Sequence, residues 1–262
     1  MIIPDLHGRK FWRQALADNI GQVDKVIFLG DYLDPYPEEI QTAPELMDCN
    51  NFYDAKGLLN TLNNIINLKK NEPDKYILLT GNHSDSYIWS NFSCASRTDY
   101  RHWEKYHKVF LENLNLFNLV YIQDNCIFSH AGISEGWANR VWEKLEFPED
   151  ELSSVMEIAV LFRDTPLTEF NKEYISLISE ISYRRGGDYM YGSCEWADIR
   201  EHIDIEKTTN TKIAPKGESG IYQVFGHTQL NGEPIITDKW ACLDCRKVFI
   251  FDTITHECKD CF

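Results

Sequence analysis

The sequence contains no apolar run of about 18 residues or more, the length that a helix needs to cross a bilayer. Its first residues also lack the basic segment and apolar stretch of a signal peptide. Basic residues are few: 26 Lys and Arg stand against 41 Asp and Glu, which gives a formal net charge of −15. A surface of that sign repels a phosphate backbone at long range. We therefore expect a cytoplasmic protein with no membrane segment and no nucleic-acid partner.

Internal repeats and low-complexity tracts are also absent. The chain has 262 residues, of which 43% are hydrophobic, so it can bury a substantial core. We interpret residues 1–262 as one domain, with an acidic surface loop at 35–51, where no periodicity is found.

Strand and helix patterns alternate through the first half of the chain. Strand-like runs, each ending in a turn that carries Asp, Asn or His, occupy 25–29, 75–80, 126–129 and 221–225. Helical patterns occupy 10–19, 52–68, 103–114, 149–162 and 168–181. The end of the chain has the composition of short strands with turns. This order predicts an α/β (α+β) fold in which two sheets pack as a sandwich flanked by helices.

Five short strings of polar residues stand at strand ends or at the start of the chain. Each alone is weak, because Asp, Asn, His and Gly are ordinary turn residues. Together they combine carboxylate, imidazole and amide oxygen, the ligand types that suit Mn, Fe or Zn. Ligand sites in open α/β sheets collect at such strand ends. The strings are Asp5-Leu6-His7-Gly8, Gly30-Asp31-Tyr32-Leu33-Asp34, Gly81-Asn82-His83, Ser129-His130-Ala131-Gly132 and Gly226-His227-Thr228.

In this order the strings resemble the signature of the calcineurin-like metallophosphoesterases: DxH, GDxxD, GNH and two further His motifs. The likeness runs through essentially the whole chain and is greatest to the branch of PPP-type serine/threonine phosphatases and diadenosine tetraphosphatases. It implies a double-sheet sandwich with outer helices and two divalent metal ions. The implied ligands are Asp5, His7 and Asp31 for the first ion, and Asp31, Asn82, His130 and His227 for the second.

Such a pair of ions, about 4 Å apart, supplies a bridging hydroxide near neutral pH and clamps the phosphoryl oxygens during in-line attack. No protein nucleophile is then needed. The resemblance implies that His83 protonates the leaving oxygen and that Asp34 orients His83. The alternative for His83 is a histidine that only completes a turn.

Two positions depart from the family pattern. In the phosphatase branch an arginine that binds the substrate phosphate follows the GDxxD string, but Pro35 stands here. The candidates to replace it are Arg184 and Arg185, of which we prefer Arg185; the alternative is that both merely end a helix. Many members also have a second His in the last motif, where this chain has Gln229. The first ion then has fewer protein ligands and more water.

Two CxxC pairs stand at the end of the chain. Their separation is close to that of knuckles that share a structural zinc, which predicts a small zinc-knuckle element at 240–262. The alternative is four reduced thiols. The remaining cysteines are widely spaced, and we expect them to be free. The paired cysteines are Cys242, Cys245, Cys258 and Cys261.

Three functions fit these patterns. The first is a phosphomonoesterase, including one for phosphoserine and phosphothreonine in proteins. The second is a nucleotide pyrophosphohydrolase of the diadenosine tetraphosphatase type, which differs mainly in loops. The third is a non-catalytic scaffold, which the intact ligand set disfavours. The expected partner is thus a phosphorylated small molecule, a nucleotide or a phosphoprotein.

Overall fold

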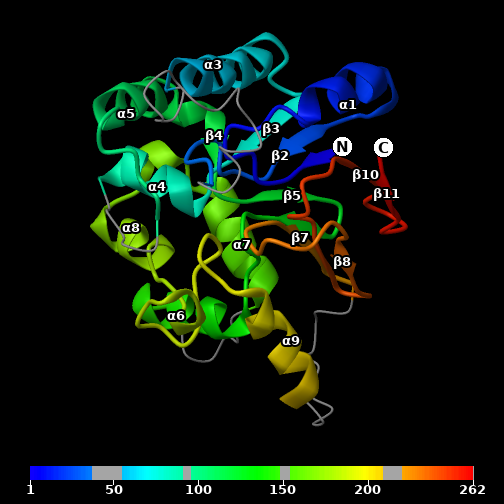
Figure 1. Ribbon diagram of the computed structural model, residues 1–262. Helices are drawn as coiled ribbons and strands as arrows, with labels where there is room; N and C mark the ends of the chain where they lie inside the picture. Colours follow the sequence, from blue (N-terminus) through cyan, green and yellow to red (C-terminus); the bar gives the residue numbers. More distant parts are fainter. Residues whose placement is uncertain (37–54, 91–95, 148–153, 209–219, 262) are drawn as a thin grey trace.

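Two β-sheets form the centre of the computed structural model, which describes residues 1–36, 55–90, 96–147, 154–208 and 220–261 (Figure 1). The first sheet has six strands in the order β11-β10-β1-β2-β3-β4, and the second has five in the order β5-β6-β7-β9-β8. The predicted α/β sandwich is confirmed.

In the first sheet, β1 to β4 are parallel, whereas β10 is antiparallel to β1 and β11 to β10. In the second, β6, β7 and β9 are parallel, with β5 and β8 antiparallel at the edges. The strands are β1 Ile2–Ile3, β2 Val26–Phe28, β3 Tyr76–Leu79, β4 Phe117–Asn118, β5 Tyr121–Gln123, β6 Cys126–Phe128, β7 Tyr222–Phe225, β8 Ile235–Ile236, β9 Trp240–Cys242, β10 Phe249–Phe251 and β11 Cys258–Asp260.

Helices lie on both sides of this pair of sheets. In Figure 1, α1, α3 and α5 lie together on one side, and α6, α7, α8 and α9 lie toward the other. The helices are α1 Trp12–Asn19, α3 Ala55–Asn71, α4 Asn82–Trp89, α5 Trp103–Glu112, α6 Glu135–Lys144, α7 Val155–Asp164, α8 Lys172–Ile178 and α9 Ile199–Thr208.

The central strands are buried on both faces, because successive side chains of a strand point to opposite sides. In β2, Val26 and Phe28 join the cluster beneath the helices. Ile27 joins a second cluster, which contains residues of both sheets, including Val224 of β7. This second cluster is the interior of the sandwich. It holds the two sheets, and therefore their strand ends, against each other.

Most predicted elements are present, and the apolar stripe of α3 is buried at Leu58, Leu62, Ile65 and Ile66. The predicted helix 168–181 is shorter, because the Asn171 side chain accepts hydrogen bonds from the first turn and starts α8 there. Sequence analysis did not predict α4, α6 or α9. Beyond Tyr36, the predicted loop 35–51 lies outside the described residues. Within the described ranges, no helix combines the length and apolarity needed to cross a membrane.

Candidate active site

Polar side chains from both sheets meet where their parallel strands end. Asp5 and His7 follow β1, Asp31 follows β2, and Asn82 opens α4 directly after β3. His130 and His227 follow β6 and β7 of the other sheet. All of these residues are buried except His227, which is partly exposed. The structure thus brings together all six residues that the sequence proposed as metal ligands.

The backbone at these strand ends is unusual. Four of the polar residues adopt left-handed conformations that few non-glycine residues populate, a kind of strain that clusters at functional sites. Gly81, which precedes α4, allows a close approach: a Cβ there would lie 2.5 Å from Asp31 Oδ1 and 2.9 Å from His130 Nδ1. The left-handed residues are His7 (φ 44°), Asp31 (φ 46°), Asp34 (φ 59°) and His227 (φ 62°).

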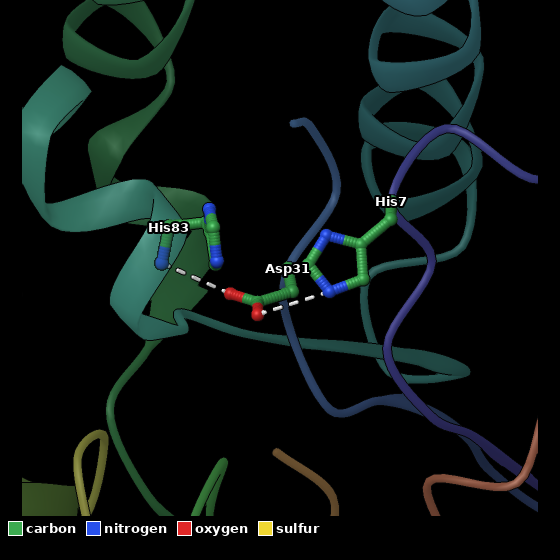
Figure 2. A group of neighbouring side chains, drawn as sticks. All are labelled: His7, Asp31 and His83. Atoms are coloured by element: carbon green, nitrogen blue, oxygen red, sulfur yellow. Dashed lines mark hydrogen bonds and ion pairs between the residues drawn. The ribbon is translucent and has the colours of Figure 1, made fainter. Parts of the chain in front are cut away.

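One group of side chains forms around His7, Asp31 and His83, whose ligand-type atoms lie within 4.8 Å of one another. Figure 2 shows the Asp31 carboxylate between the other two residues. His7 Nε2 lies 3.5 Å from Asp31 Oδ2, and the backbone N–H of His83 donates to Asp31 Oδ1 at 3.0 Å. The first strand end and the start of α4 are therefore joined through one carboxylate.

A second group forms on the other side of the same carboxylate. Ligand-type atoms of Asp31, His130 and His227 also lie within 4.8 Å of one another, with His130 Nε2 3.4 Å from Asp31 Oδ2. Asn82 Oδ1 lies 2.9 Å from both His130 Nε2 and His227 Nδ1. Asp31 is thus common to the two groups, and it contributes the same oxygen to each.

Asp5 is in contact with residues of the second group. Its carboxylate accepts a hydrogen bond from the backbone of His227 at 3.0 Å, and its Oδ1 lies 3.8 Å from His130 Nε2. Asp5 thus lies beside the same His130 ring that faces Asp31.

The hydrogen bonds of the rings indicate that this donor set fits cations. His130 Nδ1 lies 2.8 Å from the carbonyl oxygen of Leu29, which only accepts, so Nδ1 carries the proton. In the neutral ring, Nε2 then presents a lone pair to Asp31 Oδ2 and Asn82 Oδ1, which are also acceptors. His7 Nδ1 likewise faces the carbonyl oxygens of Leu33 and Asp34 at 3.0 Å. Converging lone pairs with no proton between them favour a positive ion.

The charges of the side chains agree with this reading. Burial raises the pKa of Asp31, but His130 and His83 outweigh burial and hold it well below its usual value. Burial lowers the pKa of His130, yet Asp31 and Asp5 outweigh it and raise the pKa to about 10. Nearby positive charge therefore stabilises these carboxylates. A proton on His130 supplies that charge, and a bound metal ion would take the place of the proton.

His83 and Asp34, the proposed catalytic pair, are in contact. His83 Nδ1 lies 2.9 Å from Asp34 Oδ2, and the Tyr87 hydroxyl donates to Asp34 Oδ1 at 2.5 Å. Burial raises the pKa of Asp34, and the hydrogen bond to His83 opposes that rise. Since Asp34 accepts from Nδ1, the other ring nitrogen of His83 is left to face the site.

The two candidate arginines lie on the turn Tyr183–Arg185. Arg185 reaches the second group, because its guanidinium donates to Thr228 Oγ1 at 2.5 Å, next to His227. It also forms an ion pair with Asp198 at 3.1 Å, which neutralises its charge. Arg184 instead lies over the exposed Tyr183 ring, 5.4 Å from its centroid.

The four cysteines for which the spacing predicts a structural zinc do not form a compact group in the described part of the chain. All four residues are described, yet no group of three or more metal-ligand side chains within 4.8 Å includes them. Cys242 is fully buried in β9, and its Sγ donates to the carbonyl oxygens of Gly226 and Thr228. Burial raises the pKa of Cys242 and of Cys258, which opposes the thiolate that zinc requires.

Sequence analysis missed a pair of carboxylic acids next to the site. Asp85 of α4 and Glu195 are fully buried, and burial raises the pKa of both; for Asp85, the Glu195 charge raises it further. Trp196 Nε1 donates to Asp85 Oδ2 at 3.3 Å. No sequence motif marks these two residues. Asp85 stands two residues after His83, in a stretch that has the composition of a turn, and Glu195 lies far away in the chain.

Comparison with known proteins places this geometry in a family. The family model described as calcineurin-like phosphoesterase matches residues 1–229. The chain belongs to the calcineurin-like phosphoesterases. It is therefore a phosphoric ester hydrolase, and its family uses divalent metal ions.

Solved structures with TM-scores above 0.5 support the fold of this calcineurin-like phosphoesterase. A cold-active protein-tyrosine phosphatase of a psychrophilic Shewanella species matches with a TM-score of 0.52 and 13% identity, covering 100% of this chain and 79% of that chain. A mutant of a cold-active protein tyrosine phosphatase matches with a TM-score of 0.51 and 14% identity, covering 93% of this chain and 70% of that chain. A serine/threonine phosphatase from Saccharomyces cerevisiae matches with a TM-score of 0.43 and 14% identity, covering 92% of this chain and 65% of that chain. No curated protein sequence matches.

Proposed function

We propose that this phosphoesterase hydrolyses phosphomonoesters with the help of two divalent ions of Mn, Fe or Zn. The observation that carries the proposal is the position of one atom. Asp31 Oδ2 lies 3.5 Å from His7 Nε2 and 3.4 Å from His130 Nε2, so a single carboxylate oxygen faces both groups of ligands. A carboxylate in that position suits a bridge between two ions.

The proposed residues divide between the two ions by their positions. Two ions bound there would polarise a water molecule and neutralise phosphoryl oxygens, so that no protein nucleophile is needed. Asp31 would serve both ions. Asp5 and His7 would serve the first. The second would be held by Asn82, His130 and His227.

His83 is the proposed general acid. Asp34 accepts from its Nδ1 at 2.9 Å and thereby fixes the ring, while Tyr87 fixes Asp34. The proton on Nε2 can then pass to the ester oxygen as the bond to phosphorus breaks, so the alcohol leaves neutral. Asp34 acts only through His83, as a positioning residue.

The test is metal-dependent hydrolysis with two leaving groups. We expect Asp31→Asn to abolish the hydrolysis of p-nitrophenyl phosphate in Mn²⁺. His83→Ala is expected to lower kcat about a hundredfold or more on phosphoserine, whose alkoxide needs a proton, and much less on p-nitrophenyl phosphate, whose phenolate does not. His102→Ala, which breaks a similar pair with Asp99 at 2.8 Å, is the control and should keep full activity. Equal losses on both substrates would remove the general-acid role.

The substrate class is tested separately. Phosphoserine and phosphothreonine peptides are the substrates we place first, and phosphotyrosine peptides belong in the panel because two structural neighbours are protein tyrosine phosphatases. Dinucleoside polyphosphates represent the competing pyrophosphohydrolase. A higher kcat/KM on the polyphosphates than on every phosphomonoester would overturn the proposed substrate class.

A further inference from the structure

A third arginine lies beside the first group of ligands. Arg97 donates from Nη2 to the backbone carbonyl of Asp34 at 3.0 Å, and its guanidinium carbon lies 3.5 Å from the centroid of the Tyr36 ring. The Tyr36 ring meets the His7 ring edge to face, with centroids 4.9 Å apart. One residue earlier, Ser96 Oγ lies 3.3 Å from His83 Nδ1. This segment therefore packs against the proposed catalytic pair.

The charge of Arg97 lacks a carboxylate partner within the described part of the chain. Its hydrogen bond there goes to the backbone carbonyl of Asp34, and its Nε is buried with no hydrogen-bond partner. Arg185, by contrast, is paired with Asp198 at 3.1 Å. A partly buried cation with no counter-ion favours the binding of an anion. Arg97 is thus better placed than Arg185 to supply net positive charge to a ligand.

The Tyr36 ring orients the Arg97 guanidinium, which lies over its face. A guanidinium that lies flat on an aromatic ring keeps its N–H groups in the plane, where they form paired hydrogen bonds with tetrahedral oxyanions. The hydrogen bond to the Asp34 carbonyl fixes one edge of that plane. The remaining donors can therefore be used without a large loss of side-chain entropy.

We propose that Arg97 is a substrate-binding residue, whose guanidinium binds a non-bridging oxygen of the phosphoryl group on the His7 side of the site, with Tyr36 as its platform. This inference rests on the proposed function, since it takes the oxyanion to be the phosphoryl group of the ester. The ligand class is a dianionic phosphoryl group, for which inorganic phosphate is the smallest probe.

Arg97→Gln is the decisive variant, because glutamine keeps a donor for the Asp34 carbonyl and removes the charge. Calorimetric titration of the full chain with inorganic phosphate, with and without Mn²⁺, measures the binding directly. We expect Arg97→Gln to raise the dissociation constant, and the KM for p-nitrophenyl phosphate, roughly ten- to a hundredfold. Arg97→Lys should recover part of the loss. Arg163→Ala is the control, because Arg163 pairs with its own neighbour Asp164 on the surface.

The outcomes separate the two proposals. If the parent hydrolyses phosphomonoesters and Arg97→Gln binds phosphate as tightly as the parent, Arg97 only anchors its segment and the inference fails, while the proposed function stands. If the parent binds phosphate, Arg97→Gln binds it more weakly, and no phosphomonoester is hydrolysed, Arg97 is an anion-binding residue and the proposed function fails. A lower melting temperature in Arg97→Gln together with unchanged phosphate affinity also counts against the inference.

Discussion

His202 shows how burial sets the charge of a single side chain in this fold. Its ring lies against Gly132, and its Nε2 lies 3.4 Å from the carbonyl oxygen of Ala131, next to a proposed metal ligand. Burial lowers the pKa of His202 to about 4, against 6.5 for an exposed histidine. The folded protein therefore holds this ring neutral where an unfolded chain would protonate it.

Stability is accordingly expected to fall as the pH drops from about 6.5 to about 4. In that range the unfolded state binds more protons than the folded state, so acidification favours unfolding. For a pKa shift of this size, the free energy of unfolding falls by about 3 kcal/mol in all. His202→Gln removes the titration and keeps a donor for Ala131. Urea denaturation of the metal-free protein at several pH values should show the variant losing less stability than the parent. An equal loss in both would contradict the assignment.

At the residue scale the proposed ligands were predictable, because each stands in a short string at the end of a strand. The residues that surround them were not. Arg97, Tyr87 and Glu195 reach the site from segments whose local sequence carries no motif, and their partners are set by tertiary contacts such as that of Tyr87 with Asp34. The Arg97 contact lies beside Asp34, where the sequence showed only Pro35 in place of a cation.

Helix α4 is the element on which the site depends most. Its first residue, Asn82, faces the second group, and its second, His83, joins the first group. Gly81 lies between the end of β3 at Leu79 and this helix, and its backbone approaches Asp31 and His130 closely. The start of this helix therefore fixes the positions of the two groups of ligands relative to each other.

Gly81→Ala should disturb this start without unfolding the chain. The added Cβ would lie 2.5 Å from Asp31 Oδ1, so the carboxylate or the helix must move. A displacement of about 1 Å at a catalytic group lowers activity about a hundredfold. We expect a loss of that size in kcat/KM, with weaker Mn²⁺ binding by calorimetry. Gly21→Ala, where a Cβ meets nothing within 4 Å, is the matched control, and equal activity in both variants would show that the approach at Gly81 is unimportant.

Helix α4, one of the elements that sequence analysis missed, lacks a readable period. Every residue of α4 from Asn82 to Ile88 is buried, so the helix has no polar face to set against an apolar stripe. Helix α3, in contrast, has one buried stripe and was predicted. The zinc knuckle at 240–262 stays a prediction, and Cys242 lies in β9, where it pairs with Phe225 of β7.

On the scale of the whole molecule, the candidate site joins two sheets. The strands of the first supply Asp5, His7, Asp31 and Asn82, and those of the second supply His130 and His227. Ions bound between them would tie the sheets together, whereas removal of the ions would leave carboxylates whose charge only neighbouring histidines such as His130 and His83 offset within the described residues.

Metal removal is therefore expected to lower thermal stability. Saturation with Mn²⁺ at a hundred times the dissociation constant stabilises the folded state by about 2.7 kcal/mol per site, or roughly 5 to 10 °C for a chain of this size. Calorimetric melting after dialysis against EDTA, and again after Mn²⁺ is restored, measures the change. Asp31→Asn should show little response to Mn²⁺. A parent protein that melts at one temperature in both states would argue against ions between the sheets.

The pairing of β1 has a consequence for how the chain is made. Ile2 lies opposite Ile27 on one side and Phe249 on the other. Ile27 lies close to β1 in the sequence, whereas Phe249 follows every proposed metal ligand, so the strand before Asp5 and His7 gains its second neighbour only after all of these ligands have been synthesised. The loop that carries the first two ligands thus gains its full support only through a pairing of very high sequence separation, and such pairings form slowly in folding.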